Sequence, residues 1–314
     1  MGARIGVVGS NMVDLITYID RMPAAGETLA APAFAMGHGG KGANQAVAAA
    51  KLGGDVLLVS RVGDDLFGGG TIRNFQELGI DTRHVRAVPG TQSGVAPIFV
   101  DPAGENRILI VKGANEHLLP ADVDAAAEDL KTCGLILLQL EIPLETVYYT
   151  IAWAARKGIE VLLNPAPAVP ELDVERILGA SFLVPNQTEL TILTGLPAET
   201  RAQAEAAART LVARGVRQVI VTLGAEGALL VSEGPAVHVP SVPVRAHDTS
   251  GAGDAFIGAF AQHYVANRDV LAALRWGTRY AADSITRPGT QKAFADAAGF
   301  ASFCAALEQG AARG

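Results

Sequence analysis

The chain has 314 residues, 49% of them hydrophobic and 18% charged, which is enough apolar material for one large domain with a small appendage. Its formal net charge of −7 disfavours nucleic acid or an anionic membrane as the main partner. No apolar run approaches the roughly 20 residues of a membrane span. The two widely separated cysteines, Cys133 and Cys304, and the absence of a signal-peptide pattern predict a cytoplasmic protein.

Short apolar runs alternate with helical patterns along most of the chain. The runs predict buried parallel strands at residues 5–8, 56–59, 135–140, 161–163, 182–184 and 219–222. Helices are predicted between them, for example at residues 43–52, 144–156 and 202–214. This alternation predicts a doubly wound, mostly parallel α/β sheet with helices on both faces, whose ligands gather at the carboxyl ends of the strands.

Two segments interrupt the alternation and predict a small separate sheet. Residues 15–37 mix polar and apolar side chains without a helical period, and residues 94–100 and 107–111 are β-rich runs joined by a turn signal. We expect one α/β domain over residues 1–314, with a lid from about 15–37 and 92–112 hinged near Asp14 and Gly113. A hairpin at 228–232 and 237–240 would form an antiparallel edge of the main sheet.

A free-standing sheet exposes an apolar patch and an unpaired edge to water. We therefore expect the lids of two chains to pack together in a homodimer that closes over its small-molecule substrate.

The stretch DTSGAGDAFIGAF, residues 248–260, carries the strongest chemical signal. A glycine turn that leads into a helix exposes backbone N–H groups suited to an anion such as phosphate. A carboxylate in the first turn, Asp254, would repel that phosphate unless it takes a proton from the group attacking it. The alternative is an aspartate that only stabilises the helix dipole. Neither familiar phosphate motif fits, because Lys41 is followed by Gly42 and Phe256 replaces a required glycine.

Polar motifs elsewhere have two explanations each. In GGKGAN, Lys41 and Asn44 offer donors suited to sugar hydroxyls, and Asp14 could accept hydrogen bonds from two neighbouring hydroxyls, although a plain turn and a cap explain them equally. Asn186 fits an ordinary N-cap, yet with Glu189 it could order waters on Mg²⁺. The motif TLGAEG, which begins at Thr222, suits the ribose and phosphates of a nucleotide or is a simple turn.

In this order and spacing, GSNMVD, GGKGAN, the late Asn-x-x-Glu, TLGAEG and DTSGAGD resemble the ribokinase family of sugar kinases (phosphofructokinase-B type). The resemblance runs from Gly9 to about Gly289. The phrases LNPAPA and QLE are closer to pentose kinases, and GSNMVDLIT, GETLAAPAF and GGKGANQAVAAAKL are similar to the bacterial deoxyribokinases. The resemblance implies an ATP-dependent phosphotransferase that acts on a sugar hydroxyl.

The resemblance also implies roles for single residues. Asp254 would take the proton from the terminal hydroxyl of the sugar, and the backbone of Gly251, Ala252 and Gly253 would form the anion hole. The sugar-binding residues would be Met12, Asp14, Gly40, Lys41, Asn44, Glu141 and Asp254. The ATP-binding residues would be Asn186, Thr222, Gly224, Gly227 and Gly253, with Thr278 near the adenine.

Two metals belong to the same implied picture. Mg²⁺ would accompany ATP, with Glu189 holding it through water. Members of the family often bind a monovalent cation, K⁺, beside the anion hole. Its ligands would map to Asp248, Ser250, Ser284, Arg287, Gly289 and Ala293. A hydroxyl is expected at position 293, so Ala293 could contribute only its backbone.

Met12 bears on the choice of sugar. It stands where ribokinases commonly have Asn, two residues before Asp14, and it offers only apolar bulk to the 2-hydroxyl of ribose. Burying an unmatched hydroxyl costs about 1–3 kcal/mol, which favours 2-deoxy-D-ribose over D-ribose. The alternatives are a ribokinase in which Met12 is a core residue, another carbohydrate kinase of the family, or a non-catalytic sensor that kept the fold. The intact Asp254 argues against the sensor.

Overall fold

The computed structural model describes residues 4–103 and 105–311, which form a nine-stranded sheet and a separate four-stranded sheet. Every neighbouring pair from β11 to β5 is parallel, and the last two strands form an antiparallel edge. In spatial order the large sheet contains β13 (Val237–Val239), β12 (Ala228–Val231), β11 (Val219–Thr222), β10 (Phe182–Leu183), β9 (Glu160–Leu163), β8 (Cys133–Leu138), β1 (Arg4–Val8), β4 (Val56–Gly63) and β5 (Asp81–Val88).

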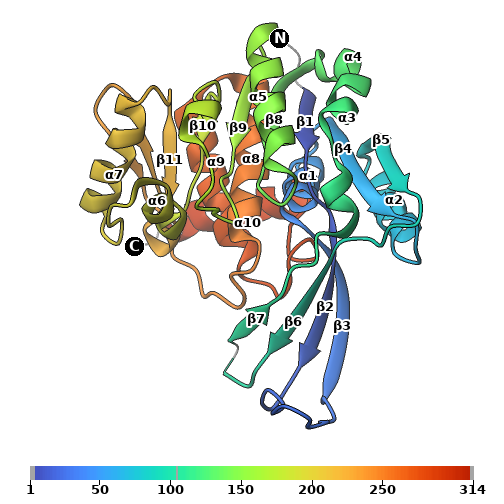
Figure 1. Cartoon of the computed structure of the whole chain (residues 1–314). Helices are drawn as coiled ribbons and strands as arrows, with labels where there is room; N and C mark the ends of the chain where they lie inside the picture. Colours follow the sequence, from blue (N-terminus) through green and yellow to red (C-terminus); the bar gives the residue numbers. More distant parts are fainter. Residues whose placement is uncertain (1–3, 104, 312–314) are drawn as a thin grey trace.

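Helices cover both faces of the large sheet (Figure 1). Alternate residues of β1 explain the two layers, since Ile5 and Val7 are buried in one apolar cluster and Val8 in the other. The first cluster is completed by α1 (Lys41–Lys51), α2 (Gly68–Glu77), α8 (Ala252–Asn267), α9 (Val270–Ser284) and α10 (Ala297–Ala311). The second is completed by α3 (Pro120–Ala125), α4 (Ala127–Leu130), α5 (Leu144–Lys157), α6 (Gln187–Thr194) and α7 (Arg201–Ala213). Short 3₁₀ helices are η1 (Gly113–His117), η2 (Val174–Ile177) and η3 (Gly224–Glu226).

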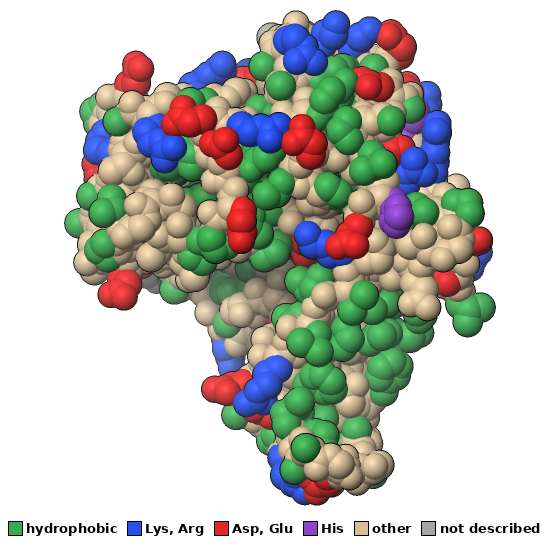
Figure 2. Space-filling view, in the orientation of Figure 1, with side chains coloured by type: hydrophobic (Ala, Val, Ile, Leu, Met, Phe, Trp, Pro, Cys, Tyr) green, Lys and Arg blue, Asp and Glu red, His purple; other side chains and the backbone are tan. Residues whose placement is uncertain are grey.

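The small sheet projects from the carboxyl-end side of the large one (Figure 1). Its order is β3 (Ala33–Gly39), β2 (Met12–Tyr18), β6 (Val95–Val100) and β7 (Asn106–Ile108). Phe34 and Met36 pair with Thr17 and Leu15, so the strand alternation places all four on one face. Phe34 is 60% exposed and Met36 52% exposed. Hydrophobic side chains gather over this projecting sheet in Figure 2.

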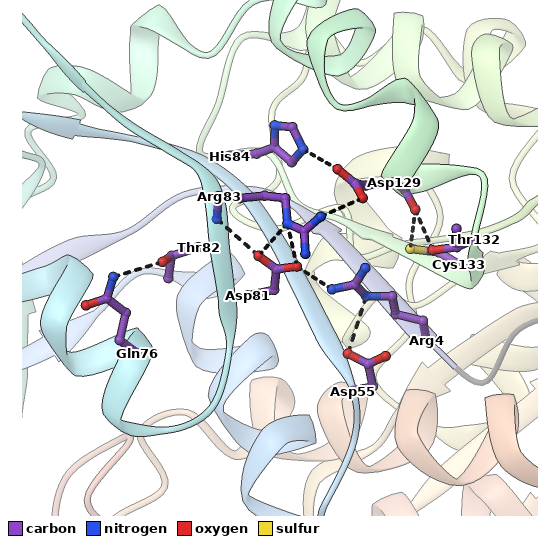
Figure 3. Close-up of polar contacts among 10 residues, drawn as sticks. All are labelled: Arg4, Asp55, Gln76, Asp81, Thr82, Arg83, His84, Asp129, Thr132 and Cys133. Atoms are coloured by element: carbon purple, nitrogen blue, oxygen red, sulfur yellow. Dashed lines mark hydrogen bonds and ion pairs between the residues drawn. The ribbon is translucent and has the colours of Figure 1, made fainter.

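Ion pairs join the amino ends of the parallel strands (Figure 3), at the end of the large sheet that lies away from the small sheet in Figure 1. Arg4, the first residue of β1, pairs with Asp55 at 3.3 Å and with Asp81, the first residue of β5. The Asp129 carboxylate accepts from Arg83 at 3.0 Å and lies 2.8 Å from His84 Nε2. The neighbouring thiol of Cys133 is buried, which raises its pKa to about 12.

The predicted fold class is confirmed: a mostly parallel sheet with helices on both faces and a small second sheet. Several bounds were wrong. Strand β8 ends at Leu138 rather than at residue 140, β10 has only two residues, and β7 ends at Ile108, beyond which only Val111 bridges back to Val95. Both cysteines are free, and among the described residues no helix combines the length and apolar character needed to cross a membrane.

Candidate active site

Polar residues collect where parallel strands of the large sheet end. Ser10 follows β1, Glu141 follows β8, Asn164 follows β9 and Asn186 follows β10. Because these strands are parallel, their carboxyl ends lie along one edge of the sheet. Two adjoining cavities open there, of about 710 Å³ and about 170 Å³. Their shared lining residues are Asn186, Thr222, Thr249, Ala252 and Gly253.

The start of α8 lies between the two cavities. Gly251 caps the helix in the left-handed region, with φ of 73°. A Cβ at this position would lie 2.4 Å from Thr290 Cγ2, so a glycine is required by both its conformation and the space. The first N–H groups of a helix have no carbonyl partner within it and carry its positive dipole end. The amides of this first turn are therefore suited to an anion, as predicted from the sequence.

Asp254 lies in this first turn, is 7% exposed and lines the smaller cavity. Its Oδ2 accepts a hydrogen bond from Asn44 Nδ2 at 3.0 Å, and its Oδ1 accepts one from Gln45 Nε2 at 3.0 Å. Both donors lie at the start of α1, 210 and 209 residues earlier in the chain. Asp254 is thus held by one donor on each oxygen, and lone pairs on both remain available to a further partner.

A glycine on α8 brings the two helices close enough for these contacts. Gly258 lies one turn after Asp254, and a Cβ there would lie 2.5 Å from Ala48 Cβ and 2.6 Å from Gln45 O. Any larger residue would push α1 away from α8. The pairing of Asp254 with the two amides therefore depends on this small residue.

Glu141 is fixed at the carboxyl end of β8. Its Oε2 accepts from Ser10 Oγ at 2.6 Å and from the backbone N–H of Lys41 at 2.8 Å. Burial raises the pKa of Glu141, although these donors oppose the shift. The pKa of Lys41 is raised as well: burial would lower it, but the carboxylates of Asp254 and Glu141 outweigh burial. Lys41 thus places a positive charge among carboxylates beside the smaller cavity.

Asp14 belongs to the same group of carboxylates. Burial, followed by the charges of Glu141 and Asp254, raises the pKa of Asp14 to about 7. Asp14 and Met12 are two residues apart on β2 and so lie on the same face of the small sheet. Met12 is 2% exposed and pairs with Gly39. The described residues that line the two cavities do not include Met12, Asp14, Gly40, Asn44 or Glu141.

The residues assigned to ATP line the larger cavity. Asn186, Thr222, Gly224, Gly227, Gly253 and Thr278 all contribute, together with an apolar wall that includes Val242, Val244 and Ile285. The N-cap explanation of Asn186 is confirmed, and its role beside Mg²⁺ stays a prediction. Its side chain caps α6 by accepting from the N–H of Glu189 at 2.8 Å, while the residue also lines both cavities. Glu189 returns a hydrogen bond to the N–H of Asn186 at 2.9 Å and lines the smaller cavity.

The residues assigned to a monovalent cation fall into two groups. Asp248 accepts from the N–H of Ser250 at 2.9 Å and from the N–H of Gly289 at 2.8 Å, so it ties together the loops on either side of α8 and α9. Burial opposes ionisation of Asp248, but these two N–H groups outweigh burial and lower its pKa. In the second group, Arg287 Nε donates to the carbonyl of Ala293 at 2.9 Å. That carbonyl, the only contribution expected from Ala293, already has a donor. The hydroxyl of Ser284 donates to Ala281 O at 2.8 Å.

Comparison with known proteins identifies the family. Residues 3–297 match the model of the pfkB family carbohydrate kinases. The chain belongs to this family. It is 58% identical to a deoxyribokinase of Salmonella typhimurium over 92% of this chain and 95% of the relative. It is 38% identical to the ribokinase of Mus musculus over 93% and 92%, respectively.

The fold agrees with this assignment. The structure of an Arabidopsis thaliana ribokinase complexed with ribose and ATP superposes with a TM-score of 0.90 at 32% identity, covering 96% of this chain and 99% of that one. This carbohydrate kinase is therefore an ATP-binding phosphotransferase that acts on a sugar hydroxyl.

Two polar residues of this kinase site were missed in the sequence. Gln45 contacts Asp254 directly, and Ser10 holds Glu141. Gln45 follows Asn44 in the chain, and adjacent amides at the start of a helix were a usable signal. Ser10 carried no signal, because a serine after a strand is common and its partner lies 131 residues away.

Proposed function

We propose that this kinase transfers the γ-phosphoryl group of ATP to the 5-hydroxyl of 2-deoxy-D-ribose, and acts less well on D-ribose. The observation that carries the proposal is the position of Asp254, which lies in the first turn of α8 and lines the smaller cavity. Its charge contributes to the raised pKa values of Asp14 and Glu141, so the three carboxyl groups belong to one site. The higher identity to a deoxyribokinase, 58%, than to a ribokinase, 38%, supports the choice of sugar.

The proposed reaction is a direct displacement at phosphorus. Asp254 takes the proton from the 5-hydroxyl, the hydroxyl oxygen forms a bond to the γ-phosphorus, and the bond to the β-phosphate oxygen breaks to release ADP. The backbone N–H groups of Gly251, Ala252 and Gly253 stabilise the charge on the transferring group. Lys41 supports them, since it lines the same cavity with a raised pKa.

The sugar would lie against the inner face of the small sheet. Asp14 accepts hydrogen bonds from its hydroxyls, with Gly40, Lys41, Asn44 and Glu141 nearby. Met12 lies on the same face as Asp14 and offers a 2-hydroxyl no donor and only a weak thioether acceptor. Ribose would therefore lose a partner that 2-deoxyribose does not need, which is the physical basis proposed for the preference.

Two metals fit the residues present. Glu189 has carboxylate oxygens at the wall of the smaller cavity, a donor type suited to the water shell of Mg²⁺, and we propose that Mg²⁺ enters with ATP. Bound Mg²⁺ would neutralise charge on the phosphates. For K⁺, the Asp248 carboxylate fits best, because it remains ionised between two loops. Ala293 fits least well, since its carbonyl already accepts from Arg287.

The exposed apolar face that includes Phe34 and Met36 supports a homodimer joined through the small sheets, which would then act as lids. Light scattering at micromolar concentration measures this directly. We also propose the cytoplasm as its compartment, because two widely separated cysteines, Cys133 and Cys304, are typical of proteins from a reducing environment.

A coupled ADP-release assay across 2-deoxy-D-ribose, D-ribose and fructose tests the proposal, with ³¹P NMR to identify the phosphorylated position. We expect the highest kcat/KM with 2-deoxy-D-ribose and a 5-phosphate product. A higher kcat/KM with D-ribose would make the protein a ribokinase. Ribokinase is the second candidate because the similar Arabidopsis thaliana structure is that of a ribokinase complexed with ribose.

A further inference from the structure

The amides that contact Asp254 are themselves oriented by further amides. On one side, Asn44 Oδ1 accepts from Gln291 Nε2 at 3.0 Å. Behind it, Gln291 Oε1 accepts from Asn74 Nδ2 at 3.2 Å. Three amides therefore connect α2 to the carboxylate of Asp254. The middle one, Gln291, comes from the loop between α9 and α10 and is 7% exposed.

The carboxylate of Asp254 fixes the direction of every hydrogen bond in this row of three amides. A carboxylate can only accept, so Asn44 must turn its N–H₂ towards Asp254. The oxygen of Asn44 then faces away and needs a donor, which Gln291 supplies. The oxygen of Gln291 in turn faces Asn74, whose N–H₂ completes the chain. Reversal of one amide would leave two oxygens facing each other, so the three orientations are locked together.

The backbone of Gln291 is anchored to the helix that carries Asn44. Lys51, in the last turn of α1, donates from Nζ to the carbonyl of Gln291 at 2.8 Å and to the carbonyl of Phe294 at 2.7 Å. The loop and α1 are thus tied at two points, by Lys51 and by the side chain of Gln291. The amide of Gln291 therefore has a fixed starting point relative to Asn44.

The second oxygen of Asp254 is held at the same distance, but the amides behind its donor are less completely paired. Gln45 Oε1 accepts from Gln139 Nε2 at 2.6 Å, and the two hydrogens of the Gln45 amide go to Asp254 and Asn164. The oxygen of Gln139 has no hydrogen-bond partner within residues 4–103 and 105–311. The chain through Gln291 is consequently the one that is satisfied from end to end.

We propose that Gln291 is a positioning residue for phosphoryl transfer, which acts by locking the Asn44 amide with its N–H₂ towards Asp254. The lock keeps the carboxylate in one orientation, with its free lone pairs directed at the sugar hydroxyl. A general base must meet its proton within hydrogen-bond reach in a defined direction. The inference rests on the proposed role of Asp254 as that base.

Two substitutions distinguish a Gln291 side chain that orients the Asn44 amide from one that only fills space. Gln291→Met keeps the length of the side chain but removes its donor and its acceptor. Gln291→Glu keeps the shape but replaces the donor with an acceptor, which draws the N–H₂ of Asn44 away from Asp254. The matched control is Gln76→Glu, the same chemical change at an exposed position of α2 whose side chain donates a hydrogen bond to Thr82 at 3.3 Å, away from Asp254.

We expect kcat to fall about 10-fold in Gln291→Met, as for the loss of one charge-assisted hydrogen bond, and about 100-fold in Gln291→Glu. The KM for ATP should stay within about threefold of the wild type in both, because the larger cavity is untouched. Gln76→Glu should match the wild type. In an Asp254→Asn background the Gln291 substitutions should lower the residual kcat by less than about twofold, because there is no carboxylate left to orient.

Three results would overturn the inference: wild-type kcat in Gln291→Met, an equal fall in Gln291→Met and Gln291→Glu, or the same fold loss with and without the Asp254 carboxylate. If Asp254→Asn keeps its turnover, the proposed base fails and the inference falls with it. An inactive Asp254→Asn beside a fully active Gln291→Met would defeat the inference alone.

If the Gln291 variants do not fold, Asn74→Leu carries the test at a half-buried position. It removes the donor behind Gln291, and we expect a smaller loss of kcat, about threefold, that again disappears in the Asp254→Asn background. Unchanged kcat in a folded Asn74→Leu variant would contradict the proposed role of these hydrogen-bonded amides.

Discussion

The carboxylate of Asp14 occupies the space in which a side chain at Gly39 would begin. A Cβ at position 39 would lie 2.2 Å from Asp14 Oδ1 and 2.6 Å from its Cγ. The two residues lie on adjacent strands, β2 and β3, and on the same face of the small sheet. Gly39 therefore sets the place of the carboxylate proposed to bind the sugar.

Gly39→Ala should weaken sugar binding without unfolding the protein. The new methyl group meets only the end of a side chain, so Asp14 rotates away and the strands stay paired. Losing its hydrogen bonds to the sugar should raise the sugar KM by about 10- to 100-fold, with little change in Tm. Gly37→Ala is the control, since a Cβ there lies 3.9 Å from Asp14 Cβ, an ordinary contact. Equal effects of the two substitutions would refute this role for Gly39.

The carboxylate of Asp14 should lower the free energy of unfolding of the ligand-free protein at and above neutral pH. Its pKa rises from 3.8 to about 7 on folding, so the folded state binds the proton more tightly. The free energy of unfolding then decreases as the pH rises from about 4 to 7 and levels off above. Asp14→Asn should be more stable than the wild type by about 1–3 kcal/mol at pH 8, with the gain fading towards pH 4, and should lose sugar affinity. Urea unfolding at both pH values measures this; a gain that does not depend on pH would contradict it.

Asp254→Asn should abolish most turnover while leaving the fold and sugar binding nearly intact. A general base typically contributes 10²- to 10⁴-fold, and asparagine cannot take a proton. The measurement is kcat by coupled ADP release, with Tm as the control for folding. More than about a tenth of the wild-type kcat would remove Asp254 from this role. A large fall in Tm would instead favour an aspartate that serves the dipole of α8.

The sequence predicted those parts of the site whose signal is local. GAGD combines a glycine turn, a helix start and a carboxylate that would repel phosphate, all within four residues. GGKGAN likewise lies directly at the start of its helix. Gln291 gave no such signal, because its partner Asn44 lies 247 residues away and only the packing of α1 against the last loop brings them together. The same limit applies to the pKa of Asp14, which depends on charges from separate segments.

The fold shows the same division. Buried strands such as β1 and β8 are continuous apolar runs and were predicted, whereas β5 was missed. Its sequence, DTRHVRAV, begins with four polar residues and buries only Val85, because β5 is the last strand at its edge of the sheet. Strand β7 ended early because its next partner on β6 is Pro97, which has no N–H to donate. The N–H of Leu109 still donates to the carbonyl of Pro97 at 3.0 Å, and pairing resumes only between Val111 and Val95.

A monovalent cation should accelerate turnover through Asp248. This carboxylate joins the N–H groups of Ser250 and Gly289, so a cation bound beside it would order both loops next to the anion hole. If the ordered anion hole lowers the activation free energy by about 1.4 kcal/mol, kcat rises about tenfold. We expect activity in K⁺ to exceed that in tetramethylammonium by this order, and removal of Mg²⁺ to abolish turnover in both. Equal rates with the two monovalent ions would exclude the cation site while leaving the role of Mg²⁺ intact.

Met12→Asn should shift the choice of sugar towards D-ribose. Met12 and Asp14 lie on the same face of β2, and the substitution adds a donor and an acceptor where the 2-hydroxyl of ribose needs a partner. A matched hydroxyl is worth about 1–3 kcal/mol, or roughly 5- to 150-fold in relative kcat/KM. The KM for ATP should not change. The measurement is kcat/KM for both sugars in the two proteins, and Met12→Leu, which keeps the site apolar, is the control. A ratio that Met12→Asn leaves unchanged would show that the preference is set elsewhere on the same face, where Ala96 and Ile98 of β6 pair with Asp14 and Ile16.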